Sequence, residues 1–134
     1  MNKVNLSEIK EDPWQSPKGK YVVAFKGISE ALSRGRARES GHRASVDTGE
    51  PWPFDLELNR MPPGKPNFPF HAHSAQWEMY LIISGKAKVR DKDGMTEVVA
   101  GDAFVVLSAG RSYFRPEDLL QLGLLLNQLK RRCK

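Results

Sequence analysis

Residues 64–85 read GKPNFPFHAHSAQWEMYLIISG, and this stretch decides the fold. It contains His71 and His73, two positions apart, and an acid, Glu78, five positions after the second histidine. Residues two apart on a β-strand point to the same side, so both imidazoles would share a face. On one continuous strand Glu78 would point the other way. We therefore expect a bend at Ser74-Ala75, after which Glu78 faces the same interior from the next strand.

Two imidazoles and one carboxylate that converge can hold a first-row divalent metal ion and leave positions for water or substrate. An isolated HxH pair is a weak signal, because most such pairs are ordinary polar residues on a half-buried strand. The surrounding spacing is more specific. From Gly64 to Gly85 the pattern is G-x6-H-x-H-x4-E-x6-G. It closely resembles the first motif of the cupin family, with the first spacer one residue longer than the usual five.

The second cupin motif is matched only at its opening. Gly101-Asp102 followed by a strand resembles that opening, but the family then has a third metal-binding histidine. No histidine follows His73, and Ser112-Tyr113 stands in the expected region. A phenol with its usual pKa of about 10 is a poor ligand unless the metal deprotonates it. Tyr113 is therefore a weak candidate for a fourth ligand, and we expect three protein ligands and weaker binding.

The resemblance covers roughly residues 53–126 and implies an all-β fold, a single antiparallel cupin β-barrel of jelly-roll type that pairs as a homodimer. It implies a divalent ion (Fe, Mn, Ni or Zn) and a small polar ligand. By parity with Glu78, Tyr80 and Ile82 would line the pocket. The function expected is that of a metal-dependent oxygenase or isomerase. The alternatives are a non-catalytic protein that binds a small ligand and a degenerate cupin without metal, so catalysis stays open.

The segment before the motif predicts three elements and a loop. Residues 20–25 are rich enough in β-branched and aromatic residues for a strand, and Ser29 can cap a short helix through Leu32. Residues 33–51 are small, charged and non-periodic, which predicts a flexible loop. Residues 54–61 alternate between apolar and polar side chains, the pattern of a half-buried strand.

The segment after the motif predicts further short strands. Residues 77–89 form two apolar stretches around a bend at 84–85, and residues 91–94 (DKDG) favour a hairpin turn. Residues 96–100 and 103–107 are strand candidates. Residues 119–126 admit a leucine-striped helix or a return strand. The strand is favoured, because a barrel without it would keep an unpaired edge.

Length and composition set the remaining bounds. A chain of 134 residues is one domain's worth. We expect residues 1–52 to contribute an arm, a strand, a short helix and the loop, residues 53–126 the barrel, and residues 127–134 a basic tail. Most of the net charge of +5 comes from residues 111–134, with six basic and two acidic residues, so the charge does not favour nucleic-acid binding. The single Cys133, with no signal-peptide or membrane-spanning apolar run, predicts a cytoplasmic protein.

Overall fold

The computed structural model describes residues 3–32, 55–72, 76–91, 93–106, 111–117 and 120–128. Its elements are ten strands and one five-residue helix within those residues, so the all-β expectation is confirmed. No helix in the described part of the chain has the length and apolar character needed to cross a membrane.

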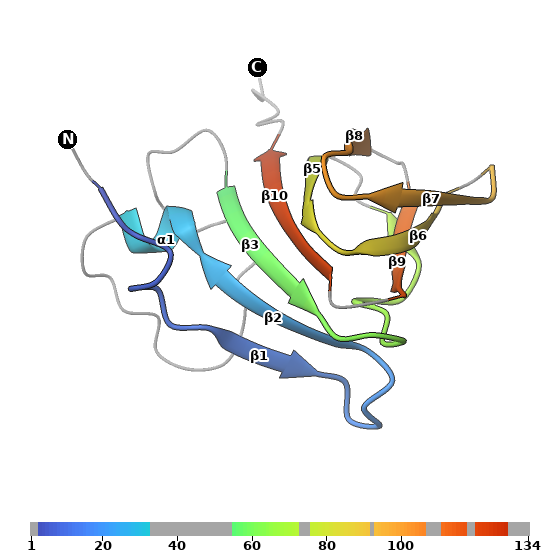
Figure 1. The fold of residues 1–134 in the computed structure, drawn as a ribbon, viewed down its shortest axis with the longest axis horizontal. Helices are drawn as coiled ribbons and strands as arrows, with labels where there is room; N and C mark the ends of the chain where they lie inside the picture. Colours follow the sequence, from blue (N-terminus) through green and yellow to red (C-terminus); the bar gives the residue numbers. More distant parts are fainter. Residues whose placement is uncertain are drawn as a thin grey trace, which may run out of the picture.

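The strands form two antiparallel sheets (Figure 1). The six-stranded sheet has the order β1 (Asp12–Gln15), β2 (Val22–Gly27), β3 (Asp55–Met61), β10 (Leu120–Gln128), β5 (Gln76–Ser84) and β8 (Ala103–Val106). The four-stranded sheet has the order β4 (His71–Ala72), β9 (Arg111–Pro116), β6 (Lys86–Arg90) and β7 (Met95–Val99). In Figure 1 the first sheet curves, and the second stands against its β5 end.

The core lies between these sheets, because both contribute buried side chains to one cluster. The six-stranded sheet supplies Val23, Phe25, Met61, Tyr80, Ile82 and Leu122, and the four-stranded sheet supplies Ala87, Val89 and Val98. The interior is therefore the space into which residues of both sheets point, as the barrel expectation requires.

The carboxyl-terminal segment is a strand. β10 lies between β3 and β5, pairing antiparallel with both, and it runs to Gln128. Without it the sheet would split into two pieces with open edges, and that requirement overrides the helix propensity of the leucines. The bend predicted at residues 84–85 is also present. Gly85 has φ 82, and the chain passes there from β5 of one sheet to β6 of the other.

Strand β3 alternates as predicted, but its buried face is the polar one. Glu57, Asn59 and Met61 are buried, whereas Leu56 and Leu58 are half-buried. The physical reason is the register. Antiparallel partners share a face, and Asn59 lies opposite Phe25 on β2 and opposite Leu122 on β10. The polar side of this strand therefore faces the interior of the barrel.

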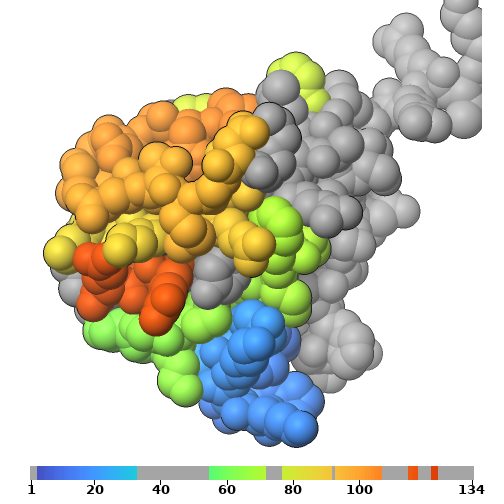
Figure 2. Space-filling view, turned by 90° about the vertical axis from the view of Figure 1, so that its right-hand side faces the viewer, coloured from blue at the N-terminus to red at the C-terminus, as the bar shows by residue number. Residues whose placement is uncertain are grey.

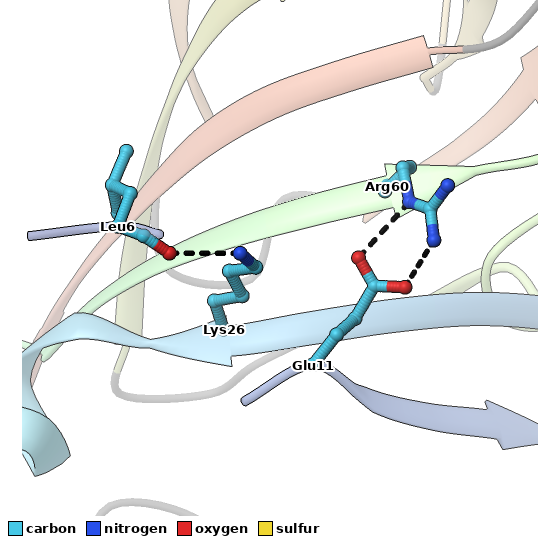
Figure 3. A network of polar contacts seen from close by, with 4 residues as sticks. All are labelled: Leu6, Glu11, Lys26 and Arg60. Carbon is cyan, nitrogen blue, oxygen red and sulfur yellow. Dashed lines mark hydrogen bonds and ion pairs between the residues drawn. The ribbon is translucent and has the colours of Figure 1, made fainter. Parts of the chain in front are cut away.

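The amino-terminal arm is held against the outer face of the six-stranded sheet (Figure 3). Lys26 Nζ on β2 donates to the carbonyl oxygen of Leu6 at 2.8 Å. Glu11 forms a two-pronged ion pair with Arg60 of β3. The arm also contains β1, a strand that the sequence did not predict. It lies at the edge of the sheet, where Pro13 is tolerated because no second neighbouring strand needs an N–H from that position.

The predicted helix is present as α1 (Ile28–Leu32), but Ser29 does not precede it. Ser29 is a buried residue inside the helix, and its hydroxyl accepts the backbone N–H of Leu56 at 2.7 Å. The expected cap is therefore wrong. The hydroxyl instead ties α1 to the beginning of β3.

Several sequence predictions concern positions outside the described residues. They are the flexible loop at 33–51, the bend at Ser74-Ala75, most of the basic tail, and Cys133.

Candidate functional site

Glu78 lies on β5 and points into the barrel. Along this strand Glu78, Tyr80 and Ile82 are buried, while Trp77, Met79 and Leu81 are exposed. The parity predicted for Tyr80 and Ile82 therefore places both in the same interior as the carboxylate. Only 6% of Glu78 is exposed, and an ionised carboxylate taken so far from water requires partners that stabilise its charge.

One partner of Glu78 is Tyr80, two residues along the same strand. The Tyr80 hydroxyl donates to Oε2 of Glu78 at 2.6 Å, within the interior. Hydrogen bonds to a charged group contribute about 1.5–3 kcal/mol. The Tyr80 ring stacks on Phe104 of β8, with ring centroids 5.1 Å apart. The stacking fixes the phenol, and the phenol in turn fixes the orientation of one carboxylate oxygen.

His71 lies on β4, in the other sheet, and is exposed. Its Nδ1 is 2.7 Å from the carbonyl oxygen of Pro69. A carbonyl only accepts, so Nδ1 carries the proton and the lone pair of the neutral ring lies on Nε2. The ring also meets Phe68 edge-on, with centroids 6.2 Å apart. A backbone carbonyl on one ring nitrogen is the usual arrangement when the other nitrogen ligates a metal.

The other predicted ligands are not described. His73 and the side chain of Tyr113 lie outside the described residues. The backbone of Tyr113 is opposite Arg90 on β6, whereas Ser112 is opposite His71 on β4. Within the described part of the chain, no three His, Cys, Asp or Glu residues form a group that could hold a metal ion. The structure thus positions Glu78 and His71 on opposing sheets, and the third ligand stays a prediction.

The sequence missed two polar residues of the interior, Glu57 and Asn59 on β3. Their exposed fractions are 7% and 5%. Among the described residues nothing donates a hydrogen bond to Asn59 Oδ1, which is fully buried. A buried acceptor left in this state costs about 1–3 kcal/mol. Strict alternation from Asp55 to Met61 was the available signal, but it does not show which face is inside.

The outer face of β6 is charged. In Figure 2 the yellow and orange atoms include those of β6 and β7, and the red-orange atoms beside them are residues 115–117. Glu117 bridges Lys86 at 3.0 Å and Lys88 at 3.4 Å. Hydrogen bonds from these two lysines lower the pKa of the Glu117 carboxyl. Because all three side chains are exposed, these ion pairs contribute little to stability.

The outer face of β5 and β8 is apolar. Five of its side chains keep between 44% and 52% of their surface exposed: Trp77, Met79, Leu81, Ile83 and Val105. Met79 lies directly opposite Val105 in the register, so the side chains are contiguous across the two strands. We call this set the apolar outer face. Exposed apolar patches of several hundred Å² commonly mark contact surfaces.

Comparison with known proteins agrees with this architecture. The cupin domain family model matches residues 58–115. The uncharacterized protein y4bD/y4pK of Sinorhizobium fredii is 47% identical over 36 residues, which are 27% of this chain and 40% of that protein. That short match indicates relatedness of a segment only.

Three solved structures share the fold. A predicted oxalate decarboxylase from Thermotoga maritima has a TM-score of 0.70 at 19% identity, covering 95% of this chain and 99% of that one. A sugar phosphate isomerase from Silicibacter pomeroyi has a TM-score of 0.69 at 17% identity, covering 94% and 75%. A cupin-2 domain protein from Rhodospirillum rubrum has a TM-score of 0.66 at 12% identity, covering 98% and 76%. At these identities the likeness concerns the fold alone.

Proposed function

We propose, from the premise that this chain carries a cupin domain, that it binds a divalent metal ion through His71, His73 and Glu78 and a small polar ligand beside that ion. The observation that carries the proposal is the hydrogen bond from Tyr80 to the buried carboxylate of Glu78. It orients an oxygen donor inside the barrel, as supporting residues do around metal ligands.

The donor set fits a first-row divalent ion. The Pro69 carbonyl assigns the proton of His71 to Nδ1, so Nε2 is the nitrogen suited to a metal. Glu78 supplies a carboxylate, and His73 would complete the facial set of two histidines and one acid. When bound, such an ion would act as a Lewis acid toward an oxygen of the ligand.

What this chain's own residues do is bind and orient. The Tyr80 ring, stacked on Phe104, lies beside the carboxylate, and Ile82 is buried on the same face of β5. Two of the similar structures are a predicted oxalate decarboxylase and a sugar phosphate isomerase, and these names concern different reactions. Ligand binding at the metal is therefore the function proposed, and a turnover reaction is not assigned.

Metal titration tests the proposal. Chelator-treated protein is titrated with Mn²⁺, Fe²⁺ without oxygen, Ni²⁺ and Zn²⁺, and binding is followed by calorimetry and by the rise in melting temperature. We expect one equivalent of at least one of these ions. A ligand at 100 times its Kd adds about 2.7 kcal/mol to stability.

Two variants and a matched control decide the assignment. His71→Ala and Glu78→Gln should each weaken binding at least 100-fold. His42→Ala removes the only histidine outside the motif and should leave the affinity unchanged. Equal metal content in the wild type and in the His71→Ala/His73→Ala double variant would refute the site.

We further propose that two copies pair through the apolar outer face defined above. The arm, tied to Lys26 and Arg60, occupies the outer side of β2 and β3 but leaves β5 and β8 uncovered. The apolar outer face carries no charge, so two copies of a chain with net charge +5 can meet there without bringing like charges together. A stable dimer buries about 800 Å² per partner, and the five half-exposed apolar side chains of this face would form the centre of such an interface. We also propose, from the single cysteine of the chain, that the protein is cytoplasmic.

A further inference from the structure

We propose that Asn59, on strand β3, is a ligand-binding residue that accepts a hydrogen bond from a hydroxyl group of a small neutral polyol held in the barrel. The inference rests on the proposed function, which places a small polar ligand in the interior of the barrel. It assigns a second polar wall, across the sheet from Glu78 and Tyr80, that neither the motif nor the metal site includes.

The register places this wall inside the barrel. Asn59 lies opposite Leu122 of β10, and Leu122 lies opposite Ile82 of β5, so all three side chains share one face of the sheet. Two residues before Asn59 on β3, Glu57 lies opposite Leu124 of β10, and Leu124 lies opposite Tyr80 of β5. With strands about 4.8 Å apart, the two walls are separated by about 10 Å at the backbone, and side chains from both reach into that space.

The open acceptor Oδ1 of Asn59 calls for a ligand group that donates a hydrogen bond. Only 5% of the residue is exposed, its Oδ1 is fully buried, and no described residue donates to it. Native structures rarely leave a buried acceptor in this condition, and a functional partner is one of the few explanations. An open acceptor of this kind selects a hydroxyl or an ammonium group.

The surroundings favour the hydroxyl. Asn59 is flanked in the register by Phe25 and Leu122, and both are buried apolar residues. A cation brought to a neutral amide in such a place would lose hydration that the amide cannot replace, whereas a hydroxyl loses little.

The experiment uses isothermal titration calorimetry on the full-length protein, both after incubation with metal and after chelator treatment. The probes are D-ribose, D-glucose, D-mannose and their alditols, offered one at a time. We expect at least one probe to bind the wild type, and Asn59→Leu to weaken that probe at least tenfold. Met61→Leu, a volume-conserving change on the same buried face, is the matched control and should change the affinity less than twofold.

A second measurement begins with the wild type. Monodeoxy analogues of the probe that binds are titrated into the wild type. One deoxy position should lose at least tenfold, and that same loss should vanish in Asn59→Leu, because the hydroxyl and the amide are partners in one bond. Removing a buried acceptor without a partner should leave the metal-free melting temperature of Asn59→Leu equal to or above that of the wild type.

The outcomes separate this inference from the metal site. If none of the six probes binds, or if Asn59→Leu binds the probe as the wild type does, the inference is overturned. A lower melting temperature of metal-free Asn59→Leu with unchanged probe affinity would identify a structural water as the partner of Oδ1 and overturn it as well. If a probe binds with the expected dependence on Asn59 while no metal binds, the inference stands and the metal proposal fails.

Discussion

Replacing Tyr80 with phenylalanine isolates the contact that orients Glu78. The change removes one hydroxyl and keeps the ring, so the stacking on Phe104 at 5.1 Å and the filling of the core are retained. What is lost is the 2.6 Å hydrogen bond to a buried carboxylate. The variant thus separates the electrostatic role of Tyr80 from its packing role.

The magnitude follows from the burial of both groups. A hydrogen bond to a charged group contributes about 1.5–3 kcal/mol, and the interior position favours the middle of that range, about 2 kcal/mol. For a chain of this size that corresponds to a fall of about 7 °C in melting temperature. The metal affinity should fall by about 10–100-fold, because the carboxylate loses the donor that holds its orientation.

Urea denaturation at pH 7 measures the first quantity, and calorimetric titration of chelator-treated protein measures the second. Tyr21→Phe is the matched control, because this half-buried tyrosine lies in the turn before β2. We expect the control to be within about 0.5 kcal/mol of the wild type. If Tyr80→Phe were as stable as the wild type and bound metal equally well, the contact would have no role in fixing Glu78, and the argument for an oriented ligand would fail.

Two further predictions concern the surface. Leu81→Lys, in the middle of the apolar outer face, should convert a dimer to a monomer, as measured by light scattering. Val99→Lys, at an equally exposed position on β7, should leave the dimer intact. A monomeric wild type would refute the pairing. Glu11→Gln should cost about 0.5 kcal/mol at pH 7, since Arg60 lowers the pKa of Glu11 and the pair is exposed. A lowered folded pKa gives stability that is present above the unfolded value of about 4.3 and is lost as pH falls through the folded pKa. The difference between Glu11→Gln and the wild type should therefore shrink in urea denaturation as the pH falls below about 4, and a difference that stays constant there would contradict the ion-pair explanation.

The motif around Glu78 predicted both the barrel and the inward side of β5, because turn chemistry and parity act within a few residues. The same local rules failed on β3. Alternation from Asp55 to Met61 showed that the strand has two different faces, but burial is decided by the neighbours on β2 and β10. Those neighbours are distant in sequence, so no window along the chain contains the information. A core that binds a ligand can also invert the usual rule that the apolar face is inside.

Similar reasoning applies to residues 119–126. Their leucines have a high helix propensity, but β3 and β5 would each keep an unpaired edge without a strand between them, and β10 fills that place. Pairing requirements of the whole sheet decided that segment, and the resemblance to a barrel was the only way to anticipate them. The cap expected at Ser29 failed for a related reason: the hydroxyl found a long-range partner in Leu56 of β3. Local capping chemistry competes with tertiary hydrogen bonds, and the sequence alone does not rank the two.

The missing third histidine and the polar face of β3 bear on each other. An ion held by three protein ligands is bound less tightly and offers more positions to a ligand. A ligand that also donates to Asn59 would gain affinity from a site two strands from β5, at the level of Ile82. The contact with Asn59 would then supply part of the ligand's affinity, and the ion would mainly orient the ligand. Because one ligand would contact both sites, the combination of Glu78→Gln with Asn59→Leu should show a coupling energy of at least about 0.5 kcal/mol in the binding of the probe.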